Sequence, residues 1–323
     1  MRFNATWTPR TDTPYRVEHY TQAADGGSYQ LLGGESSIES RTGETGASVG
    51  VSGLNWNQSG LRLVKVTVDG TELDKETGTF VVRADGGTVV KLFYDREEVT
   101  LTFDSQGGSA VSSITKGYGL RITMPAAPTK EGYDFAGWYT DAACSDGRAF
   151  AGRVMPDRNT TVYAKWTAGE YGITYVLNGG ENADGNPVRH TYGTATVVRD
   201  PARTGYDFAG WLVNGGETAR TGLTLGAEEY SGPITLTATW TAQVYDIIYE
   251  MNGGENADGN PSQHTYGRET VISAPKARDG YAFAGWLVNG TGEARTALTL
   301  GATAYTNGPI TLTATWTAGA QSV

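Results

Sequence analysis

The phrase GYDFAGW occupies residues 132–138 and again residues 205–211, and a near copy, GYAFAGW, occupies residues 280–286. A second tryptophan follows each copy, at Trp166, Trp240 and Trp316. The units therefore recur with a period of about 74 residues, which exceeds the roughly 20–50 residues of common solenoid repeats. A unit of this length is a small domain, so we predict separate modules in tandem and no continuous superhelix.

The phrase itself predicts a structural corner in each unit. A glycine at each end permits positive φ or a close backbone approach. Tyr and Phe, two residues apart, share one strand face, whereas Trp would face the other side unless the second glycine marks a β-bulge. A role in stacking on a ligand is the alternative. We predict that the module cores contain Tyr133, Phe135, Trp138, Trp166, Tyr206, Phe208, Trp211, Trp240, Tyr281, Phe283, Trp286 and Trp316.

The remainder of each unit is typical of short strands. ITLTATW (234–240) alternates apolar residues with threonine, and TTVYAKW (160–166) repeats the pattern, as expected of half-buried strands. Proline and glycine in DPARTG (200–205) disfavour a long helix before the phrase. We therefore predict a mostly β chain, α+β by class, with four or five strands in each unit.

These patterns divide the chain into six segments. The opening FNATWTP (3–9) is similar to the closing ATWTA of a repeat, so residues 1–13 are interpreted as the tail of a preceding repeat and a linker. Residues 14–98 form a different module, without the phrase. The repeats follow at 99–168, 169–242 and 243–318, and residues 319–323 form a short tail.

Composition excludes several classes of protein. The net charge of −10 argues against nucleic acid as a partner. The sequence contains no run of about 18 apolar residues, so it predicts no membrane-spanning helix. The opening MRFNATWTPR lacks the apolar region of a signal peptide. The single cysteine, Cys144, excludes an intrachain disulfide framework, and we interpret it as a buried or idle thiol.

Catalytic signatures are missing from the sequence. It contains no phosphate-binding loop, no GxSxG elbow and no HExxH motif, so we predict no enzymatic activity and no cofactor. His190 and His264 occupy equivalent HTYG stretches. The first repeat has no counterpart, and we interpret both as strand-surface residues.

The loop NGGENADGNP (178–187 and 252–261) raises the question of a calcium site. Its oxygen donors in the second repeat are Glu181, Asn182, Asp184 and Asn186. Calcium takes six to eight oxygens, commonly from carboxylates at alternating positions, and this loop has only two carboxylates. We predict a polar turn and no metal site, with calcium binding as the alternative.

Three separated phrases of the first repeat resemble, in order, the internalin-type B repeat, also called the Listeria–Bacteroides repeat. They are VTLTFDSQGG (99–108), PTKEGYDFAGWYTDAAC (128–144) and TTVYAKW (160–166). The later repeats are similar through the phrase and the closing TATW, but differ in the NGGENADGNP insert. Residues 14–97 resemble the mucin-binding-protein type repeat through YRVEHYTQAADGGSYQL, TGETG (42–46) and VVKLFYDRE.

These resemblances imply tandem small ubiquitin-like β-grasp modules that form the stalk or adhesive repeats of a bacterial surface protein. They imply an extracellular place on the cell surface, with signal and anchor outside this chain. The very short linkers DREEV (95–99), TAGEY (167–171) and TAQVY (241–245) restrict bending, so we predict a semi-extended rod, and we expect the chain to be monomeric. The implied partners are host mucin, a glycan or a surface protein. Alternatively, residues 14–98 are a specific glycan- or mucin-binding module, with Tyr15, Tyr20, Tyr29 and Trp56 as candidate ligand-binding residues.

Overall fold

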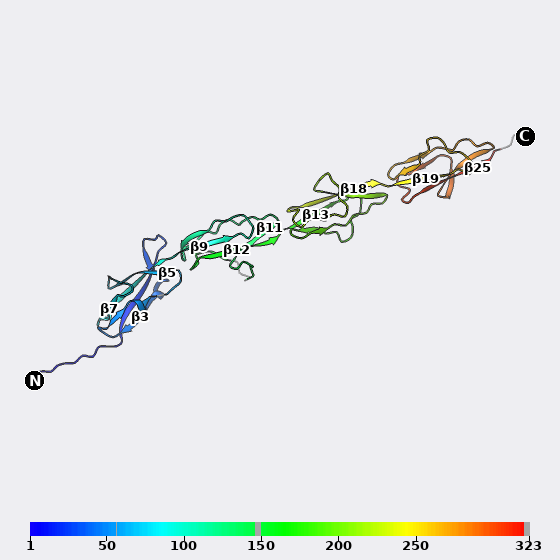
Figure 1. Cartoon of the computed structure of the whole chain (residues 1–323). Coiled ribbons are helices and arrows are strands. Elements are labelled where there is room, and N and C mark those ends of the chain that lie inside the picture. The colour runs from blue at the N-terminus through cyan, green and yellow to red at the C-terminus, as the bar shows by residue number, and fades with distance from the viewer. Residues whose placement is uncertain (56, 146–149, 320–323) are drawn as a thin grey trace. The chain divides into compact units, whose positions relative to one another are not determined.

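The regular secondary structure of the chain is almost entirely β (Figure 1), as the sequence predicts. The computed structural model describes residues 1–55, 57–145 and 150–319. It divides into two compact units, Met1–Thr167 and Ala168–Val323. Residues 1–12 form no strand, and Trp7 is 89% exposed.

The first unit begins with a module built on a six-stranded sheet. Its strands follow the order β2-β1-β8-β5-β6, and β3 also pairs with β1. The central strands β1 and β8 run parallel, which places Tyr20 opposite Phe93. The elements of this N-terminal module are β1 (Thr13–Gln22), β2 (Tyr29–Leu31), η1 (Gly34–Ser37), β3 (Ile38–Gly43), β4 (Ser48–Gly50), η2 (Ser52–Leu54), β5 (Leu61–Val68), β6 (Thr71–Leu73), β7 (Thr79–Val81) and β8 (Val89–Arg96).

The first repeat completes this unit with a four-stranded sheet in the order β10-β9-β12-β11. Its central strands β9 and β12 are parallel, and β10 pairs antiparallel with β9. The strands are β9 (Glu98–Asp104), β10 (Ile114–Gly117), β11 (Tyr133–Tyr139) and β12 (Thr160–Ala168). The N-terminal module and this repeat have separate hydrophobic cores.

The second unit contains the same sheet path twice. The orders are β14-β13-β18-β16 and β20-β19-β25-β22-β23, again with a parallel central pair. Two small sheets, β15-β17 and β21-β24, complete the repeats. The strands are β13 (Glu170–Val176), β14 (Arg189–Thr191), β15 (Thr196–Val197), β16 (Tyr206–Val213), β17 (Thr224–Leu225), β18 (Ile234–Ala242), β19 (Val244–Glu250), β20 (Gln263–Thr265), β21 (Thr270–Ile272), β22 (Tyr281–Val288), β23 (Thr291–Arg295), β24 (Leu298–Leu300) and β25 (Ile310–Ala318). The tandem modules are confirmed, and their β-grasp assignment stays a prediction.

A β-bulge turns the tryptophan of the phrase into the core, as predicted. The pairing of β16 with β18 shifts register between Phe208 and Gly210, and β22 shifts in the same way at Gly285. Gly210 has φ of 129°, which other residues rarely adopt. The ring of Trp211 consequently lies on the same side as Phe208, completely buried.

The second tryptophan of each repeat rests on the Gly-Gly turn after the opening strand. Trp240 donates its indole N–H to the carbonyl oxygen of Leu177 at 2.9 Å, and its ring covers Gly180 so closely that a Cβ atom there would overlap it. The Asn178 amide donates to the carbonyl oxygen of Ala238 at 2.9 Å. Trp166 and Trp316 make the equivalent indole bonds. The NGG turn is thus a cradle for the closing tryptophan.

The predicted core residues fall into two groups. The tryptophans of the phrase are buried, and the phenylalanines and closing tryptophans pack against the cores as partly buried residues. The prediction is wrong for the tyrosines. Tyr281 is 46% exposed, and Tyr133 and Tyr206 are half-buried outside the core clusters. Each tyrosine opens its strand at the end of the sheet, beyond the core.

The interpretation of the histidines as surface residues is also wrong. His190 and His264 are completely buried. Their Nδ1 atoms form hydrogen bonds of 2.8 Å with the hydroxyl groups of Thr196 and Thr270. The short strands β14 and β20 direct these rings inward, where a nearby hydroxyl partner offsets part of the cost of burial. Cys144 is buried, as expected.

Candidate functional site

Three aromatic rings lie together on the outer face of the sheet in the N-terminal module. Tyr20 of β1 stacks on Phe93 of β8 with ring centroids 5.1 Å apart. Tyr29 of β2 meets Phe93 edge to face at 5.2 Å and is 37% exposed. Strand alternation explains the grouping, because the neighbouring positions on β1 and β8 face the core. We call Tyr20, Tyr29 and Phe93 the aromatic patch.

Charged side chains surround the aromatic patch. The ammonium of Lys91 lies 5.5 Å from the Tyr20 ring centroid, and that of Lys65 lies 5.9 Å from the Phe93 centroid, both within the range of cation–π attraction. Tyr29 donates its hydroxyl to Asp95 at 2.6 Å, and this hydrogen bond, with some burial, raises the pKa of Tyr29 to about 12. The Tyr29 hydroxyl therefore remains a hydrogen-bond donor at a higher pH than an ordinary tyrosine, whose pKa is about 10.

The combination of flat rings and polar groups suits a ligand with one apolar face and several hydroxyl groups. Aromatic side chains offer large contact area at a small loss of conformational entropy. The lysines and carboxylates at the rim offer hydrogen bonds that fix orientation.

Two of the four candidate ligand-binding residues belong to this patch. Tyr20 and Tyr29 come together as described. Tyr15 faces the other side of β1 and lies in the core against Phe80, at 5.5 Å. Trp56 lies outside the described residues.

Phe93 is the member of the patch that the sequence analysis missed. VVKLFYDR (89–96) alternates, with Val90, Leu92 and Tyr94 buried, which places Phe93 on the outer face. That signal is present in the sequence. Its pairing with Tyr20 depends on the parallel register of two strands about 70 residues apart, which local patterns do not reveal.

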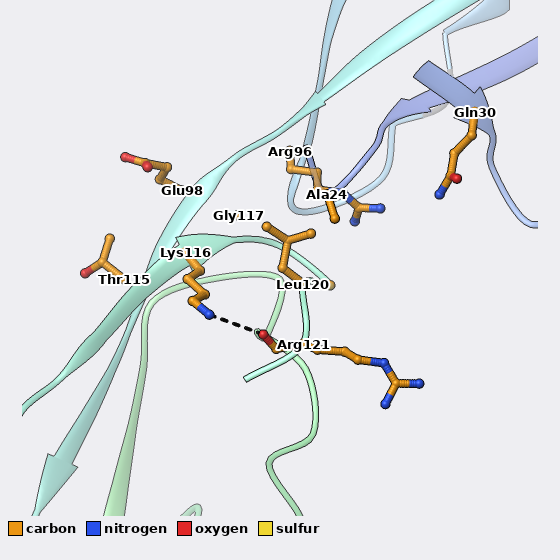
Figure 2. Close-up of a pocket in the computed structure, with 10 residues that line it drawn as sticks. Ala24, Gln30, Arg96, Glu98, Thr115, Lys116, Gly117, Leu120 and Arg121 are labelled. Atoms are coloured by element: carbon orange, nitrogen blue, oxygen red, sulfur yellow. Dashed lines mark hydrogen bonds between the residues drawn. The ribbon is translucent and has the colours of Figure 1, made fainter. Parts of the chain in front are cut away.

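A groove of about 650 Å³ lies within the first unit, where the last residues of β8 meet β10 and the turn after it. Arg96, Lys116 and Arg121 line it, together with one carboxylate, Glu98. Figure 2 shows Lys116 directed toward the backbone oxygen of Arg121, at 3.5 Å, while the Arg121 guanidinium extends away. Arg96 is engaged internally, since it donates to the carbonyl oxygen of Tyr118 at 2.6 Å. The groove is thus a locally cationic surface of an acidic protein.

The NGGENADGNP loops use their polar groups internally. Asn186 donates its amide to Asn182 at 2.7 Å and accepts a bond from the Arg199 backbone at 2.7 Å. In the third repeat, Lys276 pairs with Glu255 and Asp258. Within the described parts of the chain, no three His, Cys, Asp or Glu residues gather as metal ligands would. These bonds favour the predicted polar turn.

Comparison with known proteins identifies the repeats. The model of the Listeria-Bacteroides repeat domain matches residues 100–165, 171–239 and 245–315. Among the residues that the structure describes, no helix is both long and apolar enough for a membrane crossing.

Three relatives share part of their sequence with this chain. Two proteins of Evansella cellulosilytica, named as a membrane protein and a Gly-rich membrane protein, are 32% identical over 191 residues and 31% identical over 204 residues, or 58% and 62% of this chain. Internalin H of Listeria monocytogenes is 34% identical over 118 residues, 36% of the chain. The chain spans only 28%, 23% and 20% of these relatives' lengths. Because the repeat model matches more than half of the chain, the protein belongs to the Listeria-Bacteroides repeat domain family.

Proposed function

We propose that the chain is a non-enzymatic stalk and adhesive repeat region of a bacterial surface protein, exposed outside the cell. The observation that carries this proposal is one sheet path repeated three times, each time with its own core. Membership of the repeat family and the similarity to an internalin and to membrane proteins support it. The repeats act as spacers, and the N-terminal module makes contact with ligands.

Short connections between modules support the spacing role. Within the first unit, Glu97 alone separates β8 from β9, and within the second, Gln243 alone separates β18 from β19. A one-residue connection leaves few rotatable bonds, so we expect a semi-extended, monomeric rod. Small-angle scattering of the full chain tests this expectation. A radius of gyration of about 20 Å, that of one compact globule of this length, would contradict the semi-extended rod.

The second candidate function is binding of a neutral saccharide, such as a mucin glycan, by the N-terminal module. The aromatic patch favours it, because sugar rings present an apolar face that packs on aromatic rings and hydroxyl groups that reach the polar rim. The net charge of −10 disfavours polyanionic sugars such as heparin.

A glycan array probed with the full chain tests saccharide binding. We expect Tyr29→Ala to remove the signal, while Tyr281→Ala, at an exposed tyrosine of the third repeat, keeps it. An array without hits for the unaltered chain, or equal signals for both variants, would refute the aromatic patch as the site.

A further inference from the structure

A tyrosine of the third repeat packs on a glycine of the second repeat. Tyr266, in the HTYG stretch 264–267, covers Gly205, the first residue of GYDFAGW, and a Cβ atom at Gly205 would overlap its ring. Tyr266 also meets the ring of Tyr206 edge to face, with centroids 5.5 Å apart. Gly205 is buried and has φ of 77°, so the position favours glycine for both space and conformation.

Backbone hydrogen bonds tie the connecting residue into the same contact. Gln243 donates its N–H to the carbonyl oxygen of Gly205 at 3.0 Å, and its own carbonyl accepts the N–H of Tyr266 at 2.9 Å. The Gln243 side chain donates to Asp207 at 2.8 Å and accepts the hydroxyl of Tyr245 at 2.6 Å. The single residue between the two repeats is therefore bonded to both of them.

The same arrangement occurs within the first unit, between the N-terminal module and the first repeat. Glu97 donates its N–H to the carbonyl oxygen of Gly60 at 2.9 Å and accepts the N–H of Tyr118 at 2.9 Å. Tyr118 packs against the core of the N-terminal module. A Cβ atom at Gly60 would lie 2.5 Å from its Cγ atom. Gly60 has φ of 81° and is buried.

The two acceptor glycines belong to unrelated sequences, NQSG at 57–60 and GYDF at 205–208. In both cases, the ring that packs on this glycine belongs to the tyrosine of a Tyr-Gly pair, at 118–119 and 266–267. The shared elements are therefore the tyrosine, the buried glycine with positive φ and the bonded residue between modules. Their recurrence in two different contexts argues against a coincidental contact.

The third repeat presents half of this arrangement on its surface. Gly319 donates its N–H to the carbonyl oxygen of Gly280 at 2.9 Å, as Gln243 does to Gly205. Gly280 has φ of 75°, yet it is exposed, and Tyr281 is 46% exposed. The equivalent residues of the second repeat are buried and half-buried beneath Tyr266.

We propose that the Tyr-Gly turns of the first and third repeats are docking pins, each of which binds the positive-φ glycine of the preceding module within the same unit. We further propose that Gly280 and Tyr281 form an acceptor surface for the Tyr-Gly turn of a further repeat of this family. The pin partly buries an aromatic ring, and the two backbone bonds hold the connecting residue. Within each unit, the two joined modules thereby keep one mutual orientation. This inference deepens the proposed spacing role and is independent of adhesion.

Distance measurements between spin labels on the full chain test the pin. The labels are placed by Thr218→Cys and Thr296→Cys, both at exposed positions, with Cys144→Ala as background. We expect Tyr206→Ala and Tyr266→Ala to broaden the distance distribution and to speed exchange of the Gln243 amide about tenfold. Tyr281→Ala, the matched control in the third repeat, leaves both unchanged. Unchanged protection of the Trp211 and Trp286 amides shows that both repeats remain folded.

Equal distributions in all variants would overturn the pin, and so would equal broadening by Tyr281→Ala. Either result would leave glycan binding untouched, whereas an array without hits would leave the pin untouched.

The acceptor surface is tested by a chain in which a second copy of residues 244–318 follows Gly319. We expect about tenfold slower exchange of the Gly319 amide, which is lost when the tyrosine of the added turn is replaced by alanine. Unchanged exchange in the extended chain would overturn the acceptor assignment.

Discussion

The rings of Phe208 and Trp211 lie edge to face, with centroids 5.3 Å apart. Phe208 also meets Trp240 of the closing strand at 5.4 Å, so it links the two tryptophans of the repeat. Gly210 makes this possible, since the bulge at its position turns Trp211 toward the core. Equivalent ring contacts occur in the first and third repeats. In the second and third repeats, one glycine thus positions the aromatic core.

Gly210→Ala should destabilise the second repeat. A Cβ atom would lie 2.8 Å from the backbone nitrogen of Arg220, and the residue would be held in a sparsely populated backbone region at a cost of about 1–3 kcal/mol. Denaturant unfolding followed by hydrogen exchange measures the loss. Gly172→Ala, in an open position of β13, serves as the control, with an expected change within about 0.5 kcal/mol. Equal effects would contradict the role of the bulge.

Trp211→Ala should unfold its own repeat while the first unit stays folded. The side chain is completely buried, and truncation of a buried tryptophan costs about 3–5 kcal/mol, comparable with the whole stability of a small core. Amide exchange across the full chain locates the loss of protection. A second repeat that stays folded but loses a binding activity would instead support the ligand-stacking interpretation of the phrase.

Trp286→Phe should lower the free energy of unfolding by about 1 kcal/mol more than Trp211→Phe does. This difference is the net contribution of a typical hydrogen bond. Trp286 donates its indole N–H to the carbonyl oxygen of Ser273 at 3.2 Å. The indole nitrogen of Trp211 is buried without a hydrogen-bond partner among the described residues. Paired denaturation curves of the two variants give the difference. A larger cost at Trp211 would show that packing, and not the indole bond, separates the two sites.

The second and third repeats should lose stability as the pH falls below about 6.5, the ordinary histidine pKa. Burial lowers the pKa of His190 and His264, and nearby Glu229 partly opposes the effect at His190. Their Nε2 atoms have no hydrogen-bond partner among the described residues. Below the ordinary pKa the unfolded chain binds protons that the folded repeats exclude, so the free energy of unfolding decreases. Above it both states are neutral and stability is constant.

Denaturant titrations at several pH values measure this dependence. We expect the combined variant His190→Gln and His264→Gln to show a shallower fall of stability with decreasing pH. The unaltered chain and the double variant both contain His19 of the N-terminal module, so its contribution to the pH dependence is the same in both. Identical slopes would show that the two imidazoles do not control the acid response.

The aromatic core was predictable because its signals are local. The spacing of Phe208, Gly210 and Trp211 within one strand, combined with the period of two, required a bulge or an outward tryptophan. The closing strand showed its alternation directly. Two of the four residues proposed for ligand contact, Tyr20 and Tyr29, lie in the aromatic patch, whereas Tyr15 could not be separated from the core without the register of β1.

The sequence by itself determined the number of repeats, their strands and the tryptophans of their cores, because periodicity and alternation are properties of neighbouring residues. Only the tertiary structure decided which tyrosines of the repeated phrase are covered by a neighbouring module and which are exposed. Tyr206 and Tyr281 stand in nearly identical phrases, yet Tyr206 is half-buried beside Tyr266 and Tyr281 is exposed. The difference arises from contact with a residue 60 positions away in the next module, and no local pattern carries that information.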